Sequence, residues 1–407
     1  MKVLSVSHSI LLINSPHAGG QTYAYYMSQI AKNPNMELRV ICMCDPMSAN
    51  KEQFDAFHAK GTLLYTKGGV LRNVRRVLWD LYGRLTKKTA LNSYYKYREY
   101  IKALKRQKRE GYKPDIIILE WTQCVSLASE CRKLYPNARL IASEHDVTFL
   151  SYERQAEALQ HESSRYKHAL TMAKRVKDEE LKAICLCDKV MPHNEKDKQL
   201  LINNGIKENN IHTITAYYHN LNYIKRKEIN HDILFWGAMS RPENYNAALW
   251  FINNVMPRLA DTDVRFVVVG NKPNPVLLKC ISDRVVITGF VENPDPYFER
   301  SLCLVAPLSI GAGIKVKILE ALSSGIPVLT NQIGIEGIPA ENGKSYFHCT
   351  TPEDYEIVIR KLLYGEIDTD SITKEATEVI LNCFDLNQSA KDYINMLEGL
   401  VGLNGRH

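Results

Sequence analysis

Residues 307–322, PLSIGAGIKVKILEAL, place two glycines just before a lysine and a glutamate. The apolar run before them predicts a buried strand, and Gly311 and Gly313 predict a turn where backbone can approach a ligand. A helix starting at Gly313 would direct unpaired N–H groups and its positive dipole end at that ligand. Gly313, Lys317 and Glu320 fall at i, i+4 and i+7, so the cation and the carboxylate share one face. Such a site suits a phosphate next to a hydroxylated ring.

Lys317 and Glu320 also permit a plainer interpretation, a surface ion pair contributing about 0.2–0.5 kcal/mol. The glycines, the helix N-terminus and the cation nevertheless coincide at one strand end. Because these features are independent of one another, we favour a binding site.

Gly19 and Gly20 follow the first predicted strand and precede a predicted helix, which indicates a second turn of close approach. They do not form the G-x-G-x-x-G pattern of dinucleotide-binding folds, so nicotinamide chemistry has no support. A plain turn is the simpler interpretation of a lone Gly-Gly pair.

His145 lies in the segment Ser143–Asp146, directly after a predicted strand. It is therefore expected at the sheet edge where open α/β sheets bind their ligands. A histidine beside carboxylates can donate to a sugar hydroxyl or act as an acid or base. A structural histidine bonded to its neighbours is an equally open alternative.

Two further charged residues follow predicted strands of the second half. Arg241 comes after the strand and glycine at 233–237 and has the geometry to bind a diphosphate with two hydrogen bonds, although a surface arginine fits equally well. Glu336, in Gly334–Gly337, follows the strand at 326–330 and is expected at the same edge as the glycine turn.

The composition is that of a globular protein, and the 407 residues are too many for one ordinary core, so we expect two domains of nearly 200 residues each. No apolar run of eighteen residues predicts a membrane span, and the N-terminus does not resemble a signal peptide. The ten cysteines lack the spacing of zinc sites. We expect buried free thiols in a reducing cytoplasm, and no metal.

Apolar strands alternate with helical segments along the chain, the pattern of parallel sheets flanked by helices. We predict an α/β fold of two doubly wound, Rossmann-like domains facing a central cleft, 1–215 and 216–386. A last helix at 387–400 is expected to pack back on the first domain. The expected strands are 2–7, 38–42, 115–119, 139–143, 189–191, 233–236, 265–270, 285–288, 302–306 and 326–330. The expected helices are 21–31, the basic region within 67–113, 122–134, 151–184, 244–259, 313–323 and 351–363.

The formal net charge of +7 is unevenly spread, because residues 67–113 hold fifteen lysines and arginines against three acids. Trp79, Tyr82 and four tyrosines at 94–100 are interleaved with these charges. A solvated helical face and attachment to an anionic membrane surface are both open interpretations. Nucleic acid is not expected as a partner, since no recognised nucleic-acid-binding module accompanies the charge.

Over residues 233–347 the chain resembles the nucleotide-sugar-dependent glycosyltransferases with the GT-B fold, and within them family 4 of the retaining enzymes. Two segments and their spacing carry the resemblance, ILFWGAMSRPENYNAALWFINNVMPRL and GFVENPDPYFERSLCLVAPLSIGAGIKVKILEALSSGIPVLTNQIGIEGI. The first half matches only through Gly19-Gly20 and His145-Asp146. The resemblance implies that the second domain binds a nucleotide-sugar donor and the first a glycan or lipid-linked acceptor.

The resemblance also implies individual roles. The backbone of Gly311–Ile314 would hold the donor diphosphate, Glu320 would bind the ribose hydroxyls, and His145 would contact the sugar. The predicted site residues are His145, Lys317 and Glu320 as catalytic; Arg241, Gly311, Ala312, Gly313, Ile314 and Glu336 as donor-binding; and Gly19 and Gly20 as the acceptor and phosphate loop.

Two positions depart from the family's usual pattern. That pattern has Glu, seven residues, Glu; here Glu320 is the second, and Ala312 occupies the first position, as in members with a GAGIK sequence. Ala238 stands where the family often has an arginine, and we expect Arg241 or Lys317 to replace that charge.

We therefore expect a glycosyltransferase that needs no metal or other cofactor and retains the anomeric configuration, the latter by analogy with the family. A nucleotide-sugar epimerase or hydrolase on the same scaffold is one alternative. An inactive GT-B module serving as a binding or scaffold subunit is another, which Ala238 and Ala312 keep open. The expected location is cytoplasmic, peripheral on the inner membrane face through residues 67–113.

Overall fold

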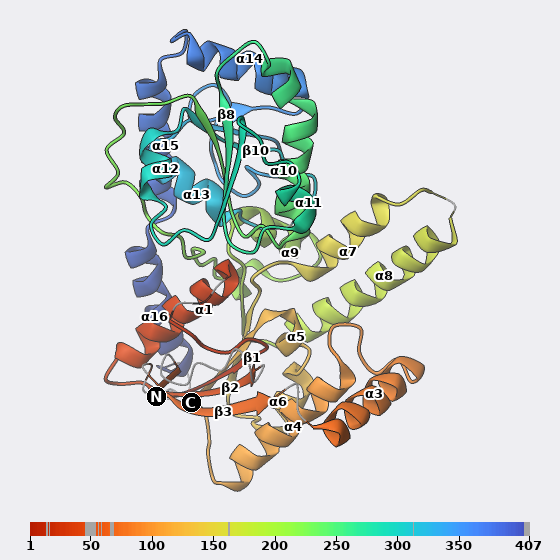
Figure 1. The fold of residues 1–407 in the computed structure, drawn as a ribbon. Helices are drawn as coiled ribbons and strands as arrows, with labels where there is room; N and C mark the ends of the chain where they lie inside the picture. Colours follow the sequence, from red (N-terminus) through yellow and green to blue (C-terminus); the bar gives the residue numbers. More distant parts are fainter. Residues whose placement is uncertain are drawn as a thin grey trace. The chain divides into compact units, whose positions relative to one another are not determined.

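The computed structural model describes residues 1–402 apart from 14, 16, 45–53, 56, 58, 66–68, 162 and 312. The chain divides into two compact units (Figure 1). Unit 1 comprises Met1–Tyr217 and the chain from Leu386 onward, and unit 2 comprises Tyr218–Asp385. The last helix of the chain therefore belongs to the first unit.

Unit 1 is built on a six-stranded sheet in the order β3-β2-β1-β4-β5-β6, in which every neighbouring pair is parallel. Its central strands are continuous apolar runs because helices cover both faces. The strands are β1 (Lys2–Ser7), β2 (Glu37–Cys44), β3 (Lys60–Tyr65), β4 (Ile116–Glu120), β5 (Arg139–Ser143) and β6 (Lys189–Met191). Its α-helices are α1 (Ala18–Lys32), α3 (Val70–Leu85), α4 (Tyr94–Arg109), α5 (Trp121–Val125), α6 (Ala128–Leu134), α7 (Thr148–Glu157), α8 (Ser164–Ile184), α9 (Glu195–Asn203) and α16 (Leu386–Gly402).

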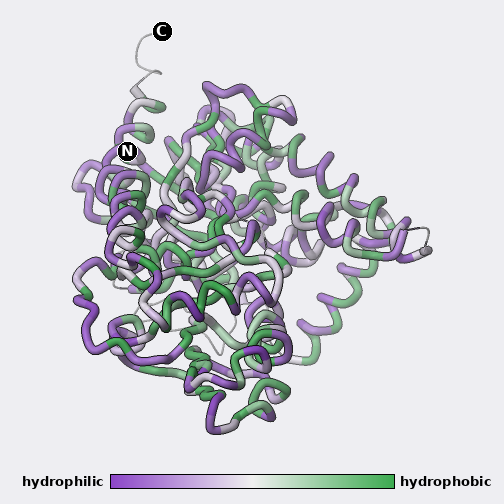
Figure 2. Tube along the Cα trace, turned by 90° about the horizontal axis from the view of Figure 1, so that it is seen from above, coloured by the Kyte–Doolittle hydropathy of each residue, from purple (hydrophilic) through white to green (hydrophobic). Residues whose placement is uncertain are grey.

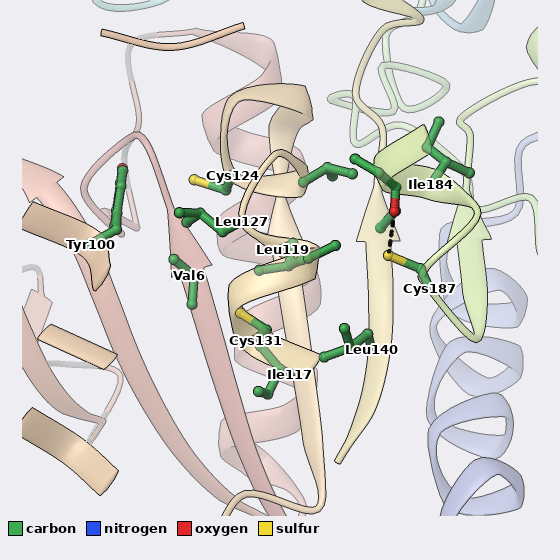
Figure 3. Close-up of a cluster of buried hydrophobic side chains, with 14 of the residues drawn as sticks. Val6, Tyr100, Ile117, Leu119, Cys124, Leu127, Cys131, Leu140, Ile184 and Cys187 are labelled. Carbon is green, nitrogen blue, oxygen red and sulfur yellow. Dashed lines mark hydrogen bonds between the residues drawn. The ribbon is translucent and has the colours of Figure 1, made fainter. Parts of the chain in front are cut away.

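Successive strand residues point to opposite faces of this sheet and enter two separate cores. Val3 and Ile116 pack in one core with side chains of α1 and α16. Val6, Ile117 and Leu119 pack in the other with side chains of α4, α5 and α6, as Figure 3 shows. The sheet is thereby held rigidly between two helical layers.

Unit 2 repeats this plan with a sheet in the order β12-β11-β10-β7-β8-β9, again with parallel neighbours. The strands are β7 (Asp232–Trp236), β8 (Arg265–Val269), β9 (Val285–Gly289), β10 (Cys303–Ala306), β11 (Val328–Thr330) and β12 (Phe347–His348). The α-helices are α10 (Pro242–Asn254), α11 (Pro275–Leu278), α12 (Asp295–Arg300), α13 (Val316–Ser323), α14 (Pro352–Leu363) and α15 (Thr369–Cys383).

Both sheets have the doubly wound order 3-2-1-4-5-6 when strands are counted within their own unit. The predicted α/β fold class with two Rossmann-like units is thus confirmed. In such sheets the strand order reverses at one point, and ligands bind at the carboxyl ends of the strands there. The reversal lies between β1 and β4 in unit 1 and between β7 and β10 in unit 2.

Most predicted strands are confirmed within two residues, but several elements differ from the prediction. The strands β3 and β12 and the helices α9, α11, α12 and α15 were not predicted. The strand β3 is an edge strand whose first half is polar or glycine, and β12 has only two residues. The predicted helix at 151–184 is two helices, α7 and α8, which lie side by side in Figure 1. Ser163 begins the second of them, since its side chain accepts a hydrogen bond from the backbone N–H of Tyr166.

Figure 2 shows that most helices mix hydrophilic and hydrophobic residues along their length. In the described part of the chain, no helix is long and apolar enough to cross a membrane. None of the ten cysteines, all of which lie in the described part of the chain, forms a disulfide, and seven are buried. Cys185, directly after α8, and Cys383, the last residue of α15, are exposed, which differs from the expected burial of the thiols.

Candidate functional site

The glycine turn after β10 has the backbone geometry that only glycine adopts easily. Gly311 has a φ of +149° and Gly313 a φ of +67°. A Cβ atom on Gly311 would lie 2.8 Å from Cε of Lys315, so a side chain there would displace the end of that lysine. Ile314 is half-buried in the same turn, and Ala312 lies outside the described residues.

The helix after this turn begins at Val316, so its predicted start at Gly313 is wrong. Lys315 explains the difference, because its extended backbone (φ −91°, ψ 92°) carries the chain from the turn to the helix. Its Nζ atom donates a hydrogen bond to the carbonyl oxygen of Gly313 at 2.5 Å. The turn is therefore braced by a lysine side chain, and Lys317 lies in the first turn of α13.

Glu320 is a buried carboxylate in the second turn of α13. The indole Nε1 of Trp236, the last residue of β7, donates to its Oε2 at 2.8 Å. The backbone N–H of His219 donates to Oε1 at 3.4 Å. Burial raises the pKa of Glu320, and the Trp236 bond opposes that rise. A single carboxylate held in this way at the sheet edge suits a pair of hydroxyl groups.

Lys317 lies at the turn after β7. Its Nζ atom donates to Oδ1 of Asn244, and it lies 3.2 Å from the place that a Cβ on Gly237 would occupy. Burial lowers the pKa of Lys317 from 10.5 to about 7, so a neighbouring anion would restore its charge. Lys317 and Glu320 bond to different partners, which contradicts the surface-ion-pair interpretation.

Arg241 occupies the exposed rim of the same turn. Its side chain is 58% exposed, and its Nη2 pairs with Oε1 of Glu243 at 2.5 Å. The carbonyl of Ala238 accepts a hydrogen bond from Nδ2 of Asn244 at 2.8 Å, which ties the turn to α10. Of the two candidates for the charge missing at Ala238, Lys317 bonds through its side chain to Asn244 of this network, whereas Arg241 joins it only through its backbone.

Glu336 is brought close to the glycine turn by Lys315. The Nζ atom of Lys315 is 3.5 Å from Oε2 of Glu336, and their side chains are only 11% and 6% exposed. Asn331 orders the intervening loop, since its Nδ2 donates to the carbonyl of Leu308 and its Oδ1 accepts from the backbone N–H of Gly334. Lys315 was not predicted as a site residue, because helical periodicity places it off the Lys317–Glu320 face.

In unit 1, Gly19 and Gly20 lie in the first turn of α1, so their predicted place before the helix is wrong. His17 starts the helix early, because its Nδ1 accepts a hydrogen bond from the backbone N–H of Gly20 at 2.9 Å. A Cβ on Gly20 would lie 2.0 Å from Oγ of Ser15, so this position requires glycine.

His145 stacks on Trp121, with ring centroids 4.0 Å apart and an interplanar angle of 12°. Its Nε2 lies 3.0 Å from Oε2 of Glu120, and both of these side chains are almost fully buried. A Cβ on Gly19 would lie 3.4 Å from Nε1 of Trp121 and 3.5 Å from Nδ1 of His145. The structure therefore brings Gly19 and His145 together, with Trp121 beside them.

The His145–Glu120 contact is a neutral hydrogen bond. Burial lowers the pKa of His145 to about 3 and raises the pKa of Glu120 to about 8. We assign the stronger of the two possible hydrogen bonds, in which the protonated carboxyl of Glu120 donates to Nε2 and the imidazole proton resides on Nδ1. Among the described residues Nδ1 has no hydrogen-bond partner, so His145 presents an unused donor on the side of Gly19.

Glu120 and Trp121 were not predicted as site residues. They join β4 to α5 beside the point where the strand order reverses, and Trp121 has a φ of +63°, which is rare for a large side chain. The signal that would have found them is a charged residue ending an apolar strand. The rings of His8 and His193 lie 4.6 Å from Trp121 and 4.8 Å from His145, respectively. Within the described ranges, no three His, Cys, Asp or Glu side chains form a metal-like group.

Residues 230–364 match the family model described as Glycosyl transferases group 1. The matched region holds most of unit 2, including the glycine turn and α13. A Klebsiella pneumoniae protein described as an uncharacterized 44.6 kDa protein in the cps region is 26% identical over 137 residues, covering 31% of this chain and 35% of that protein. The match thus spans about a third of that relative's length.

Solved structures resemble the whole chain. Alr3699/HepE from Anabaena in complex with UDP has a TM-score of 0.66 and 14% identity, covering 98% of this chain and 100% of that one. The lipopolysaccharide outer core galactosyltransferase WaaB in its apo form has a TM-score of 0.60 and 15% identity, covering 98% and 99%. These likenesses define the GT-B fold.

Proposed function

We propose that the protein is a glycosyltransferase that moves a sugar from a nucleotide-sugar donor to a glycan or lipid-linked acceptor. The observation that carries the proposal is the buried Glu320 and the half-buried Lys317 on α13, next to the glycine turn of the group 1 region. A carboxylate fixed by an indole N–H suits two ribose hydroxyls, and a lysine near a helix N-terminus suits a diphosphate.

In the proposed donor complex, backbone N–H groups of Gly311–Ile314 and the N-terminus of α13 bind the diphosphate. Lys317 takes up a proton there and contributes a positive charge. Arg241 can swing to the same anion from its exposed position, and Lys315 holds Glu336 near the sugar side of the turn.

The proposed reaction breaks the bond between the anomeric carbon and the diphosphate oxygen. Negative charge develops on the leaving diphosphate, and the preorganised N–H groups and Lys317 stabilise it. The acceptor hydroxyl attacks the face that the diphosphate leaves, so the configuration is retained, and its proton passes to the departing phosphate oxygen. His145 donates from Nδ1 to a substrate hydroxyl, with its tautomer set by Glu120. In unit 1, we assign Gly19 and Gly20, in the first turn of α1, to the acceptor and phosphate loop.

We place the protein in family 4 of the retaining enzymes, in its GAGIK variant. The proposal requires no resident metal or cofactor, because Lys317 and the α13 N-terminus supply the positive charge that the leaving group needs. Ala238 does not weaken it, since Lys317 lies at the Ala238 turn.

Two similar proteins favour a role in polysaccharide biosynthesis. One is the Klebsiella pneumoniae protein of the cps region, and the other is the lipopolysaccharide outer core galactosyltransferase WaaB. We propose a cytoplasmic protein attached peripherally to an anionic membrane through residues 67–113. This location would bring it to a lipid-linked acceptor.

A panel of nucleotide sugars tests the proposal. A bound donor should raise the unfolding temperature in proportion to the logarithm of its concentration, and UDP-sugars are the first to try because a structural neighbour was solved with UDP. Incubation with acceptor should then release the nucleoside diphosphate. Donor epimerised or hydrolysed at full rate without acceptor would make the protein an epimerase or hydrolase. No donor binding at all would leave only the scaffold role.

A further inference from the structure

Helix α3 lies at the surface of unit 1 (Figure 1). Its exposed apolar residues form a continuous stripe along the helix. The stripe residues recur at intervals of three and four, the spacing of one helix face. Each of them is between 45% and 83% exposed, and Tyr82, at one edge, also contacts the ring of Tyr94 in α4. They are Val70, Leu71, Val74, Val77, Leu78, Leu81, Tyr82 and Leu85.

The opposite face of α3 is docked on α4. Oδ1 of Asp80 accepts a hydrogen bond from the backbone N–H of Tyr95 at 3.0 Å. The guanidinium of Arg98 lies 3.3 Å above the ring of Trp79. Gly83 is buried, and a Cβ there would lie 2.4 Å from the side chain of Tyr94. These contacts hold α3 with its apolar stripe turned outward.

Positive charges border the stripe on both sides. At 100° per residue, the exposed Arg75 and Arg84 fall just beyond its two edges. Asp80 is the one acid within α3, and it faces α4. An apolar centre with cationic borders is the pattern of a helix lying in the interface of an anionic bilayer.

A basic hollow of about 510 Å³ follows the C-terminal end of α3 and extends to α8. Five cations line the hollow, but only two acids, Asp178 and Glu179. Glu179 already accepts hydrogen bonds from Thr89 and from the backbone N–H of Ala90. Such a hollow suits a phosphate group. The cations that line it are Lys87, Lys88, Lys174, Arg175 and Lys182.

We propose that α3 is the membrane-docking element of the protein, lying in the surface of an anionic bilayer. The apolar stripe enters the boundary between headgroups and acyl chains, Arg75 and Arg84 bind lipid phosphates, and the basic hollow holds a further anionic headgroup. The inference refines the attachment proposed for residues 67–113 and rests on that part of the proposed function, not on the donor site. A second copy of the chain fits the stripe less well, because it would bring cationic borders together.

Sedimentation of the full chain with vesicles tests the inference. Vesicles of phosphatidylcholine with about one-third phosphatidylglycerol should bind the protein, and pure phosphatidylcholine should bind it far less. Replacing Leu78 and Leu81 by asparagine should lower the vesicle partition coefficient roughly tenfold or more. Replacing Arg75 and Arg84 by glutamine should lower it about fivefold for each arginine.

Matched variants in unit 2 provide the control. Ile281 and Ile357 are 56% and 53% exposed, close to the 59% and 52% of Leu78 and Leu81. Their replacement by asparagine should leave vesicle binding unchanged, as should glutamine at the exposed Lys361 and Lys374. Each variant is checked for an unaltered unfolding temperature and UDP affinity, which separates failure of the docking surface from failure of the donor site.

Two results would overturn the inference. One is an unmodified protein that does not sediment with anionic vesicles. The other is vesicle binding that survives in the Leu78/Leu81 variant while a concentration-dependent dimer disappears, since the stripe would then contact a second copy of the chain.

Discussion

The Nε2 atom of His145 lies 3.0 Å from Oε2 of Glu120, and both side chains are buried at the carboxyl edge of the unit 1 sheet. Because the pKa of Glu120 is raised to about 8 and that of His145 is lowered to about 3, neither is charged at pH 7. This neutral pair keeps the proton on Nδ1 of His145. The contribution of this pair to folding stability therefore depends on pH in a different way from that of an ion pair.

Replacing Glu120 by glutamine should flatten the pH dependence of stability between about pH 6.5 and 8. A carboxyl with a pKa of 4.5 when unfolded and about 8 when folded binds more protons in the folded state, so its contribution to stability falls as pH rises through that range. His145 titrates below 6.5 and does not obscure this window. Urea unfolding at several pH values measures the slope. The exposed Glu157→Gln variant should keep the wild-type slope, and a Glu120→Gln slope equal to wild type would refute the neutral pair.

Glu320→Gln should weaken binding of UDP, the first nucleotide to test, by roughly 10- to 100-fold, because a hydrogen bond to a charged group contributes about 1.5–3 kcal/mol. Trp236→Phe should have a smaller effect in the same direction, since it removes only the indole N–H that orients the carboxylate. Calorimetric titration measures both. Unchanged affinity in both variants would remove Glu320 from the nucleotide site.

Lys317 should take up a proton when a nucleoside diphosphate binds. With a pKa of about 7 in the free protein, the ammonium is largely lost by pH 8, and an adjacent diphosphate favours its return. Affinity should therefore fall as pH rises from 7 to 9. Titrations at pH 8 in buffers with different ionisation enthalpies measure the uptake, which should be lost in Lys317→Met and kept in the exposed Lys344→Met. Equal uptake in Lys317→Met would assign the proton to another group.

Sequence periodicity was sufficient for the fold, because ten of the twelve strands are apolar runs long enough to recognise. It failed for β3, whose edge position leaves Lys60 and Gly61 exposed. It also misplaced the start of α13, since nothing in the order of residues reveals that Lys315 bonds back to Gly313.

The site contacts were harder to predict because they join distant positions. Trp236 and Glu320 are 84 residues apart, and Asn244 and Lys317 are 73 apart. Only the parallel order of β7 and β10 brings them together. A motif therefore revealed which residues could bind an anion, while the sheet topology determined their partners.

Gly311→Ala should disrupt the donor turn without unfolding unit 2. The new Cβ would lie 2.8 Å from Cε of Lys315, and the alanine would have to keep the backbone φ of +149°. Gly343 offers a matched control, because its φ is +75° and a Cβ there meets nothing within 4 Å. Both variants should lose about 1–2 kcal/mol of unfolding free energy through backbone strain. Only Gly311→Ala should also lower the affinity for a nucleoside diphosphate, because it displaces Lys315 and the N–H groups of the turn. Equal diphosphate affinity in the two variants would place the anion elsewhere than at this turn.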